Sequence, residues 1–201
     1  MTTTALIVID VQESFRQQPQ WAAISNPGIA GQVNRLAAAA RAHDNLVVWV
    51  LHTEPGTGTF FDPASGYVQL MDGLVPGAGE PVITKTSHNA FTTTNLQQLL
   101  TTRGIRDLTI CGIRTEQCCE TTARVASDLG FDVTFVTDAT ATSPIEHRDA
   151  PAGRPVAEIL ADPLTLSTDD IITRTEYALA GRFATIHTVA ELTATGVPVG
   201  G

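Results

Sequence analysis

Several features are scarce in this chain, and each shortage argues against a class of protein. Lysine and arginine number 12 against 21 acidic residues, for a net charge of −9, and no basic cluster is present, so a nucleic-acid partner is not expected. No apolar run approaches the roughly 20 residues that cross a bilayer, so no membrane association is expected either. The beginning, MTTTALIVID, has neither a basic segment nor a cleavage site, which argues against a secretory signal.

Cysteine is scarce as well. The chain has three cysteines, two of them adjacent, which cannot form a disulfide framework and which suit a reducing cytoplasm. What is present is a globular composition, with 43% hydrophobic and 16% charged residues. The length of 201 residues falls in the range of one α/β domain, and we predict a single domain over residues 1–201.

Short apolar runs alternate with segments of helical periodicity along the chain. This alternation predicts an α/β fold: a three-layer sandwich with a mostly parallel six-stranded sheet and helices on both faces. Strands are predicted at 5–10, 46–51, 81–84, 107–111, 132–136 and 183–187, and helices at 29–43, 95–103, 116–129, 156–160 and 169–179. Two long segments, 52–80 and 143–170, are predicted to be irregular, and the second is interpreted as a lid or a subunit contact.

Three ionisable residues follow predicted strands. They are Asp10, Lys85 and Cys118, and ligands of open parallel sheets bind outside the carboxyl ends of the strands. Each residue type taken singly is more often structural, but together they suit covalent catalysis. Cys118 would attack an electrophilic carbon, Asp10 would exchange protons with it, and Lys85 would stabilise both anions.

The segment around Cys118 is the most informative part of the chain. A buried strand at Asp107–Cys111 leads into a helix predicted at Glu116–Leu129, so Cys118 would lie in the first helical turn. Free backbone N–H groups and the helix dipole favour a thiolate there. Cys111 is interpreted as a small buried hydrophobic residue. Cys119 would face a different side of the helix from Cys118, so at most one of the pair would point into the cleft.

Other interpretations remain open at this level. The three cysteines favour a second hypothesis, a thiol redox sensor that uses Cys118 and Cys119. A nucleotide-binding domain ranks lower, because no glycine-rich motif follows the first strand. A binding protein without activity is a further alternative. His52, His88 and His147 are interpreted as ordinary loop residues, since Asp10 already supplies acid–base chemistry.

Three pieces of the chain resemble one family of enzymes. IDVQESF (9–15), KTSHNAF (85–91) and GIRTEQCCETTARVASDLGFDVTFVTDA (112–139) are similar to the isochorismatase-like cysteine hydrolases, which include nicotinamidases and N-carbamoylsarcosine amidases. The resemblance implies a nucleophile at Cys118 and a triad completed by Asp10 and Lys85. It also implies a cis peptide bond at Ile113–Arg114, with the backbone N–H groups of Arg114 and Cys118 directed at an oxyanion.

The chain departs from parts of the family. Nicotinamidases have a metal site built from Asp-x-His and a further histidine after the second strand, whereas this region reads LHTEPGTGTFFDP (51–63). No metal or other cofactor is therefore expected, and nicotinamide is a less favoured substrate. Isochorismatases proper, which cleave a vinyl ether, lack the nucleophilic cysteine, so Cys118 argues against that reaction.

Together these observations predict a metal-independent hydrolase that cleaves a C–N bond of a small amide, carbamoyl or ureido compound. The alternative on the same fold is an ether- or ester-cleaving enzyme. Substrate contacts are predicted for five loop residues, among which the guanidinium would suit a carboxylate or carbonyl oxygen: Phe15, Glu54, Phe60, Phe91 and Arg114. The resemblance also implies a homo-oligomer, either a dimer or a tetramer.

Overall fold

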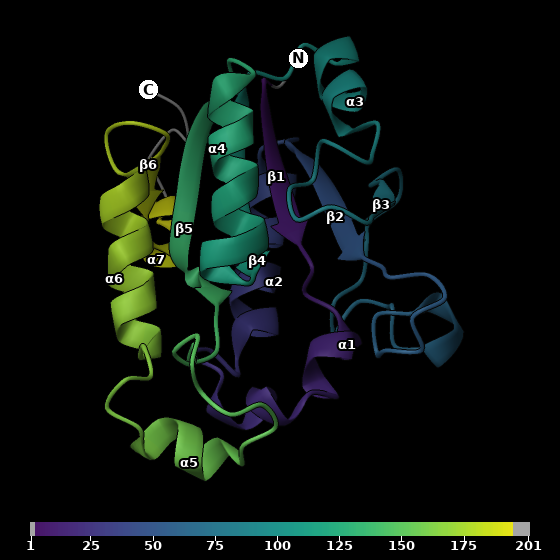
Figure 1. Ribbon diagram of the computed structural model, residues 1–201. Coiled ribbons are helices and arrows are strands. Elements are labelled where there is room, and N and C mark those ends of the chain that lie inside the picture. The colour runs from purple at the N-terminus through teal and green to yellow at the C-terminus, as the bar shows by residue number, and fades with distance from the viewer. Residues whose placement is uncertain (1–2, 195–201) are drawn as a thin grey trace.

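The computed structural model describes residues 3–194, and its centre is a sheet of six parallel strands. The strands follow the order β3-β2-β1-β4-β5-β6 across the sheet (Figure 1). Their bounds are Thr4–Ile9 (β1), Leu46–His52 (β2), Val82–Lys85 (β3), Asp107–Ile113 (β4), Asp132–Ala141 (β5) and Thr185–His187 (β6). The predicted α/β sandwich with six strands is thereby confirmed.

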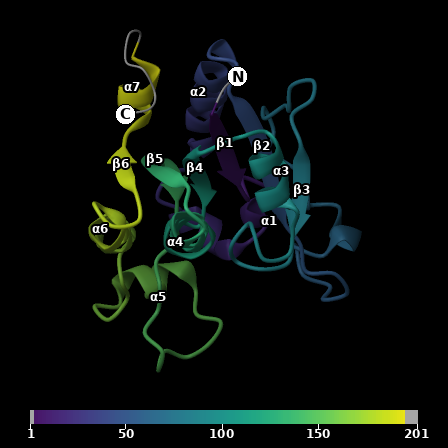
Figure 2. The ribbon, with the colours of Figure 1, turned by 90° about the horizontal axis from the view of Figure 1, so that it is seen from above.

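Helices cover both faces of the sheet, as the view in Figure 2 shows. One face carries α3, α4 and α6, and the other carries α2 and α7. The bounds are Glu13–Arg16 (α1), Ile29–Ala42 (α2), Leu96–Thr102 (α3), Glu120–Asp128 (α4), Val156–Ala161 (α5), Thr168–Leu179 (α6) and Val189–Thr193 (α7). In the described part of the chain, no helix combines the length and apolar character of a membrane span.

Strand β1 shows why the sheet lies at the core. Its sequence TALIVI is buried at every position, because parallel strands covered on both faces need apolar side chains throughout. Successive side chains point to opposite faces. Ile7 and Ile9 therefore belong to the core under α3 and α4, while Leu6 and Val8 pack towards α2.

The segment predicted as one helix from Glu116 divides into two parts. Thr115–Cys119 forms a single π-helical turn, and α4 begins only at Glu120. The backbone N–H of Cys119 donates to the Arg114 carbonyl at 3.1 Å, a bond that spans five residues. Turns of this kind are frequent at functional sites. Cys118 thus precedes α4 and does not lie in its first turn.

Strand β5 is longer than its predicted end at residue 136. It continues to Ala141, and after a shift of register Thr140 and Ala141 pair with Gly112 and Ile113 of β4. Sequence alone places a turn there, because Thr137 and Asp138 interrupt the apolar run. The pairing with β4 overrides that local signal and holds the chain just before the π-helical turn. The short helices α1 and α7 were not predicted either.

Gly112 allows β1 and β4 to approach closely at the end of the sheet. Its φ of +134° is a conformation that side chains disfavour, and a Cβ atom would lie 1.9 Å from the carbonyl oxygen of Ile9. Ile9 is the Gly112 partner in the sheet and directly precedes Asp10. A glycine at this position therefore sets the spacing between Asp10 and the cysteine turn.

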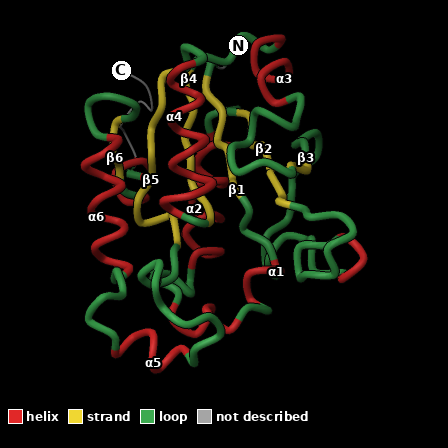
Figure 3. The backbone as a smooth tube through the Cα atoms, viewed as in Figure 1, coloured by secondary structure: helices red, strands yellow, loops and turns green. Residues whose placement is uncertain are grey.

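The segment 143–170 lies beyond the carboxyl edge of the sheet, together with α5 (Figures 1 and 3). Arg154 holds it together, since the guanidinium contacts Glu146 at 2.8 Å and Asp162 at 2.7 Å. All three side chains are less than one-third exposed. The segment is a folded structure over the carboxyl edge, and its interpretation as a lid or subunit contact stays a prediction.

Candidate active site

Asp10, Lys85 and Cys118 meet at the carboxyl edge of the sheet. Asp10 directly follows β1, Lys85 is the last residue of β3, and Cys118 lies in the turn after β4. Strand β2 separates β1 from β3, so the long Lys85 side chain reaches past β2 to Asp10. The sheet order thus brings together three residues that lie more than thirty positions apart in the sequence.

The Lys85 ammonium is the centre of this group. Its Nζ lies 2.7 Å from Asp10 Oδ2 and 3.4 Å from Cys118 Sγ. It also contacts the Ser87 carbonyl oxygen at 3.1 Å and His52 Nδ1 at 3.4 Å. Asp10 and Lys85 are fully buried, and Cys118 is 7% exposed. A buried ion pair of this kind is retained only when both charges are held by close partners.

Asp10 is held in an unusual backbone conformation. Its φ is +54°, which is uncommon for a residue other than glycine and costs roughly 1–3 kcal/mol. The Asp10 N–H donates to the Val50 carbonyl of β2 at 2.8 Å, which fixes this conformation. Oδ2 faces the Lys85 ammonium, whereas Oδ1 has no hydrogen-bond donor among the described residues. The carboxylate also interacts with the Cys118 thiol, so Asp10 faces both other members of the group.

Burial controls the protonation of both acidic groups. It raises the pKa of the Asp10 carboxyl, and the Lys85 charge opposes this effect. Burial also raises the pKa of the Cys118 thiol to about 12, with a further increase from the Asp10 charge and a smaller decrease from Lys85. Burial therefore favours the thiol form, because the desolvation of the sulfur outweighs the Lys85 charge. The support expected from a first helical turn is also missing, because Cys118 lies before α4.

The interpretation of His52 as an ordinary loop residue is wrong, because it is the last residue of β2 and a neighbour of the Lys85 ammonium. It ends β2, pairs in register with Lys85, and places Nδ1 towards that ammonium. Its Nε2 lies 3.4 Å from Glu54 Oε1. The available signal was its place at the carboxyl end of a strand adjacent to β1, the same signal that selected Asp10 and Lys85.

Arg114 lies at the start of the cysteine turn. The Ile113–Arg114 peptide bond is cis, as the resemblance implied. The guanidinium is half-buried and donates to Gln18 Oε1 at 3.5 Å, and Arg114 forms no ion pair within the described residues. Its positive charge is therefore available to a ligand. The roles of the Arg114 and Cys118 backbone N–H groups stay predictions.

The other predicted substrate contacts fall in different surroundings. Phe15 is buried and packs edge-on against Phe61, with ring centres 5.0 Å apart. Phe61 in turn packs against the His52 ring at 5.6 Å, so this aromatic pair borders the site. Glu54 is 40% exposed, and Phe60 is exposed as well. These residues lie on or near the loop that follows β2.

Phe91 does not belong with them. Its ring stacks on Phe131 at 5.9 Å, within the core under α3 and α4. Phe131 directly precedes β5 and so lies at the amino end of the strands, away from Asp10. The Phe91 ring is thus part of the core cluster that also contains Cys118, and its role as a substrate contact stays a prediction.

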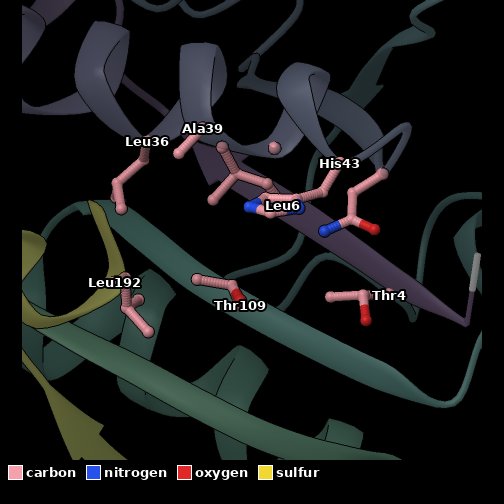
Figure 4. A pocket seen from close by; sticks show the side chains of 9 residues that line it. Thr4, Leu6, Leu36, Ala39, His43, Thr109 and Leu192 are labelled. Carbon is pink, nitrogen blue, oxygen red and sulfur yellow. The ribbon is translucent and has the colours of Figure 1, made fainter. Parts of the chain in front are cut away.

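Two cavities lie at the amino edge of the sheet, opposite the Lys85 group. One has about 30 Å³ and lies between α2 and the starts of β1 and β4, as Figure 4 shows with Leu36, Thr4 and Thr109. The other has about 980 Å³ and is lined by the first residues of β4 and β5. Neither is lined by Asp10, Lys85 or Cys118, so the site is defined by its chemistry and not by these hollows.

Within residues 3–194, no three side chains of His, Cys, Asp or Glu lie together in a way that could hold a metal ion. His52 and Glu54 contact each other where nicotinamidases have their metal ligands after the second strand. Both groups are directed to partners within the protein.

Comparison with known proteins identifies the class. The Isochorismatase domain family matches residues 4–166, and the chain therefore belongs to the isochorismatase family of hydrolases. Streptothricin hydrolase of Streptomyces noursei is 30% identical over 186 residues, covering 92% of this chain and 65% of the relative. Ureidoacrylate amidohydrolase RutB of Enterobacter sp. (strain 638) is 30% identical over 172 residues, covering 68% and 74% respectively.

A solved structure agrees with this assignment. An isochorismatase from Pseudomonas putida KT2440 has a TM-score of 0.79 and 30% identity, with 94% of this chain and 89% of that chain covered. The family resemblance noted from three sequence motifs is confirmed.

Proposed function

We propose that this protein hydrolyses a C–N bond of a small amide, carbamoyl or ureido compound, with Cys118 as nucleophile and without a metal. One observation carries the proposal: a single buried ammonium contacts a carboxylate at 2.7 Å and a thiol sulfur at 3.4 Å. Nucleophile, base and fixed positive charge are the groups that covalent acyl transfer requires.

The proposed reaction begins with proton transfer. The Cys118 S–H bond breaks as the proton passes to the Asp10 carboxylate, and Sγ forms a bond to the substrate carbonyl carbon. Backbone N–H groups of Arg114 and Cys118 would stabilise the oxyanion. As the C–N bond breaks, Asp10 returns the proton to the leaving amine. Water activated by Asp10 then hydrolyses the thioester or thiocarbamate and releases Cys118 as a thiol.

The geometry lowers the cost of the first step. Forming a thiolate from a thiol with a pKa of about 12 is unfavourable in isolation. Here the proton acceptor is a carboxylate whose own pKa is raised by burial, so it accepts a proton more readily than an exposed aspartate. The negative charge moves between two groups that both contact Lys85, and it keeps its partner throughout.

The substrate class rests on relatives and on local charge. The name of one relative, ureidoacrylate amidohydrolase, describes C–N hydrolysis of a ureido compound that bears a carboxylate. Arg114 directly precedes the cysteine turn, and its guanidinium forms no ion pair with a described residue, which suits a carboxylate on the substrate. We keep Phe15, Glu54 and Phe60 as proposed neighbours of the substrate. A dimer or tetramer also stays a prediction.

The two other interpretations have less support. Ether or ester cleavage on this fold requires no cysteine adduct. A redox sensor would give no role to the Lys85 ammonium that contacts both Asp10 and Cys118, and Cys111, Cys118 and Cys119 are buried free thiols in the structure.

The test is a panel of small amides and ureido compounds assayed with matched cysteine variants. We expect Cys118→Ala to lower turnover by at least about 10³-fold, while Cys119→Ala, which removes the adjacent buried thiol, retains it. Intact mass spectrometry should detect a covalent adduct in the wild type and Cys119→Ala but not in Cys118→Ala. EDTA should leave turnover unchanged.

Comparable turnover in Cys118→Ala and wild type would remove the nucleophile. Activity lost to EDTA and restored by zinc would overturn the metal-independent mechanism. Turnover of ethers or esters without any adduct would instead favour the alternative reaction.

A further inference from the structure

The Lys85 ammonium has more acceptors around it than protons to give. Four acceptor atoms lie within 3.4 Å of Nζ: Asp10 Oδ2, the Ser87 carbonyl oxygen, His52 Nδ1 and Cys118 Sγ. An ammonium group has three protons and no acceptor site. The two shorter contacts, to Asp10 and Ser87, use two of them. His52 and Cys118, both at 3.4 Å, are left to share the third.

The surroundings of His52 define which of its nitrogens carries the proton. Nδ1 faces a group that can only donate, and Nε2 faces the Glu54 carboxylate, which accepts. A neutral ring with its proton on Nε2 satisfies both neighbours, whereas an imidazolium would direct an N–H at the ammonium. Burial and the Lys85 charge lower the pKa of His52, which agrees with a neutral ring.

His52 is held firmly enough to act in this way. Its backbone N–H donates to Gln12 Oε1 at 2.7 Å, and its carbonyl accepts from Gln12 Nε2 at 3.0 Å. Its ring packs on Phe61 and is 15% exposed. Glu54 is fixed in turn by the Thr59 hydroxyl, which donates to Oε2 at 3.0 Å.

We propose that His52 is a positioning residue that accepts the third Lys85 proton in the resting site and releases it when Cys118 becomes a thiolate. The proposal rests on the proposed function, because it takes Cys118 as the nucleophile. In the step, the S–H bond breaks and an O–H bond forms on Asp10. The third N–H of Lys85 then turns from His52 Nδ1 to the sulfur anion, and no electrons are transferred to another species.

The consequence is a competition that opposes thiolate formation in the resting enzyme. The charged and titratable groups that face the Cys118 thiol are Asp10, Lys85 and Cys119, and those that face His52 are Lys85, Asp10 and Glu54. If His52 Nδ1 is removed, Cys118 Sγ is the only acceptor that remains for the third proton of Lys85. The thiolate then becomes more favourable, although no group contacting the sulfur has changed.

The test measures the rate at which iodoacetamide alkylates Cys118 as a function of pH, with the site identified by peptide mapping. We expect His52→Leu to lower the midpoint of the alkylation rate against pH by about one pH unit. At pH values below the midpoints of both wild type and variant, the variant should therefore be labelled about tenfold faster. His52→Asn is the matched control, because its Oδ1 takes the place of Nδ1 and should keep the wild-type midpoint. Cys118→Ala gives the blank.

An unchanged or higher midpoint in His52→Leu would overturn the proposal, as would equal behaviour of His52→Asn and His52→Leu. Should the variants not fold, ¹⁵N NMR of wild-type imidazole groups at neutral pH decides the question. A proton on Nε2 of His52 is expected, and a proton on Nδ1 or an imidazolium contradicts it. Alkylation needs no substrate. If the labelling follows the expectation but the protein cleaves no amide, only the proposed function is rejected and the role of His52 stands.

Discussion

The two ends of β3 carry two ion pairs of opposite character. Before the strand, both oxygens of Glu80 are occupied: Arg41 contacts them at 2.6 and 2.8 Å, and the Trp49 indole N–H and the Gly77 N–H donate to Oε2 at 2.8 and 2.7 Å. At the end of the strand, Lys85 contacts Asp10 at 2.7 Å, but Asp10 Oδ1 has no donor within the described residues.

The protonation behaviour of the two carboxylates follows from this difference. Hydrogen bonds from Arg41, followed by those from Trp49 and Gly77, lower the pKa of Glu80 to about 2. Burial without sufficient donors raises the pKa of Asp10. A carboxylate with all its acceptor sites filled resists protonation and serves as an anchor. One with fewer donors and a raised pKa is suited to take a proton.

The largest expected effect comes from removing the Lys85 charge at the end of β3. Lys85→Met leaves the Asp10 carboxylate buried without its partner, which should lower the free energy of unfolding by about 3–5 kcal/mol. Turnover should fall by at least about 10²-fold, because the fixed charge for both anions is gone. Urea unfolding and steady-state kinetics on the same preparation measure the two effects.

The double variant Asp10→Asn with Lys85→Met separates stability from chemistry. It removes both charges, and asparagine tolerates the positive φ at position 10. Most of the lost stability should return, since replacing both partners of a buried pair is often neutral, whereas turnover should stay absent. Wild-type turnover in this double variant would contradict the proposed roles of both residues.

Removing the Glu80 charge before β3 should lower the stability of the protein but leave its turnover nearly unchanged. Glu80→Gln keeps the size of the side chain but removes its charge, and we expect the unfolding free energy to fall by about 3 kcal/mol at neutral pH. The value of kcat should stay within about twofold of wild type, because Glu80 contacts no residue of the Lys85 group. Glu158→Gln on exposed α5 is the matched control and should change neither quantity. A large loss of turnover with intact stability would break the distinction between the two ends.

The smallest effect is a pH dependence that belongs to Glu80 alone. Its folded pKa of about 2 lies below the ordinary 4.5, so its contribution is fully present above pH 4.5 and is lost as pH falls towards 2. The difference in unfolding free energy between wild type and Glu80→Gln should therefore shrink over this range. Urea titrations at several acidic pH values measure it, and a constant difference would contradict the anchor role.

Much of the fold was predictable because its signals are local. The β1 and β2 runs are apolar throughout, and a strand covered on both faces needs no further specification. Asp10 could be selected because it follows such a strand, Lys85 because it follows a short apolar run, and Cys118 because a motif surrounds it. The π-helical turn and the extension of β5 were not predictable, since both depend on bonds to residues that are distant or out of helical register.

The sequence by itself determined the alternating architecture, the family and the three ionisable residues at strand ends. Only the tertiary structure decided that Cys118 is buried, which favours its thiol form, that Phe91 belongs to the core, and that His52 shares the Lys85 ammonium. The physical reason is that desolvation and hydrogen-bond competition depend on neighbours from separate strands. Sequence spacing does not specify those neighbours, whereas sheet order and register do.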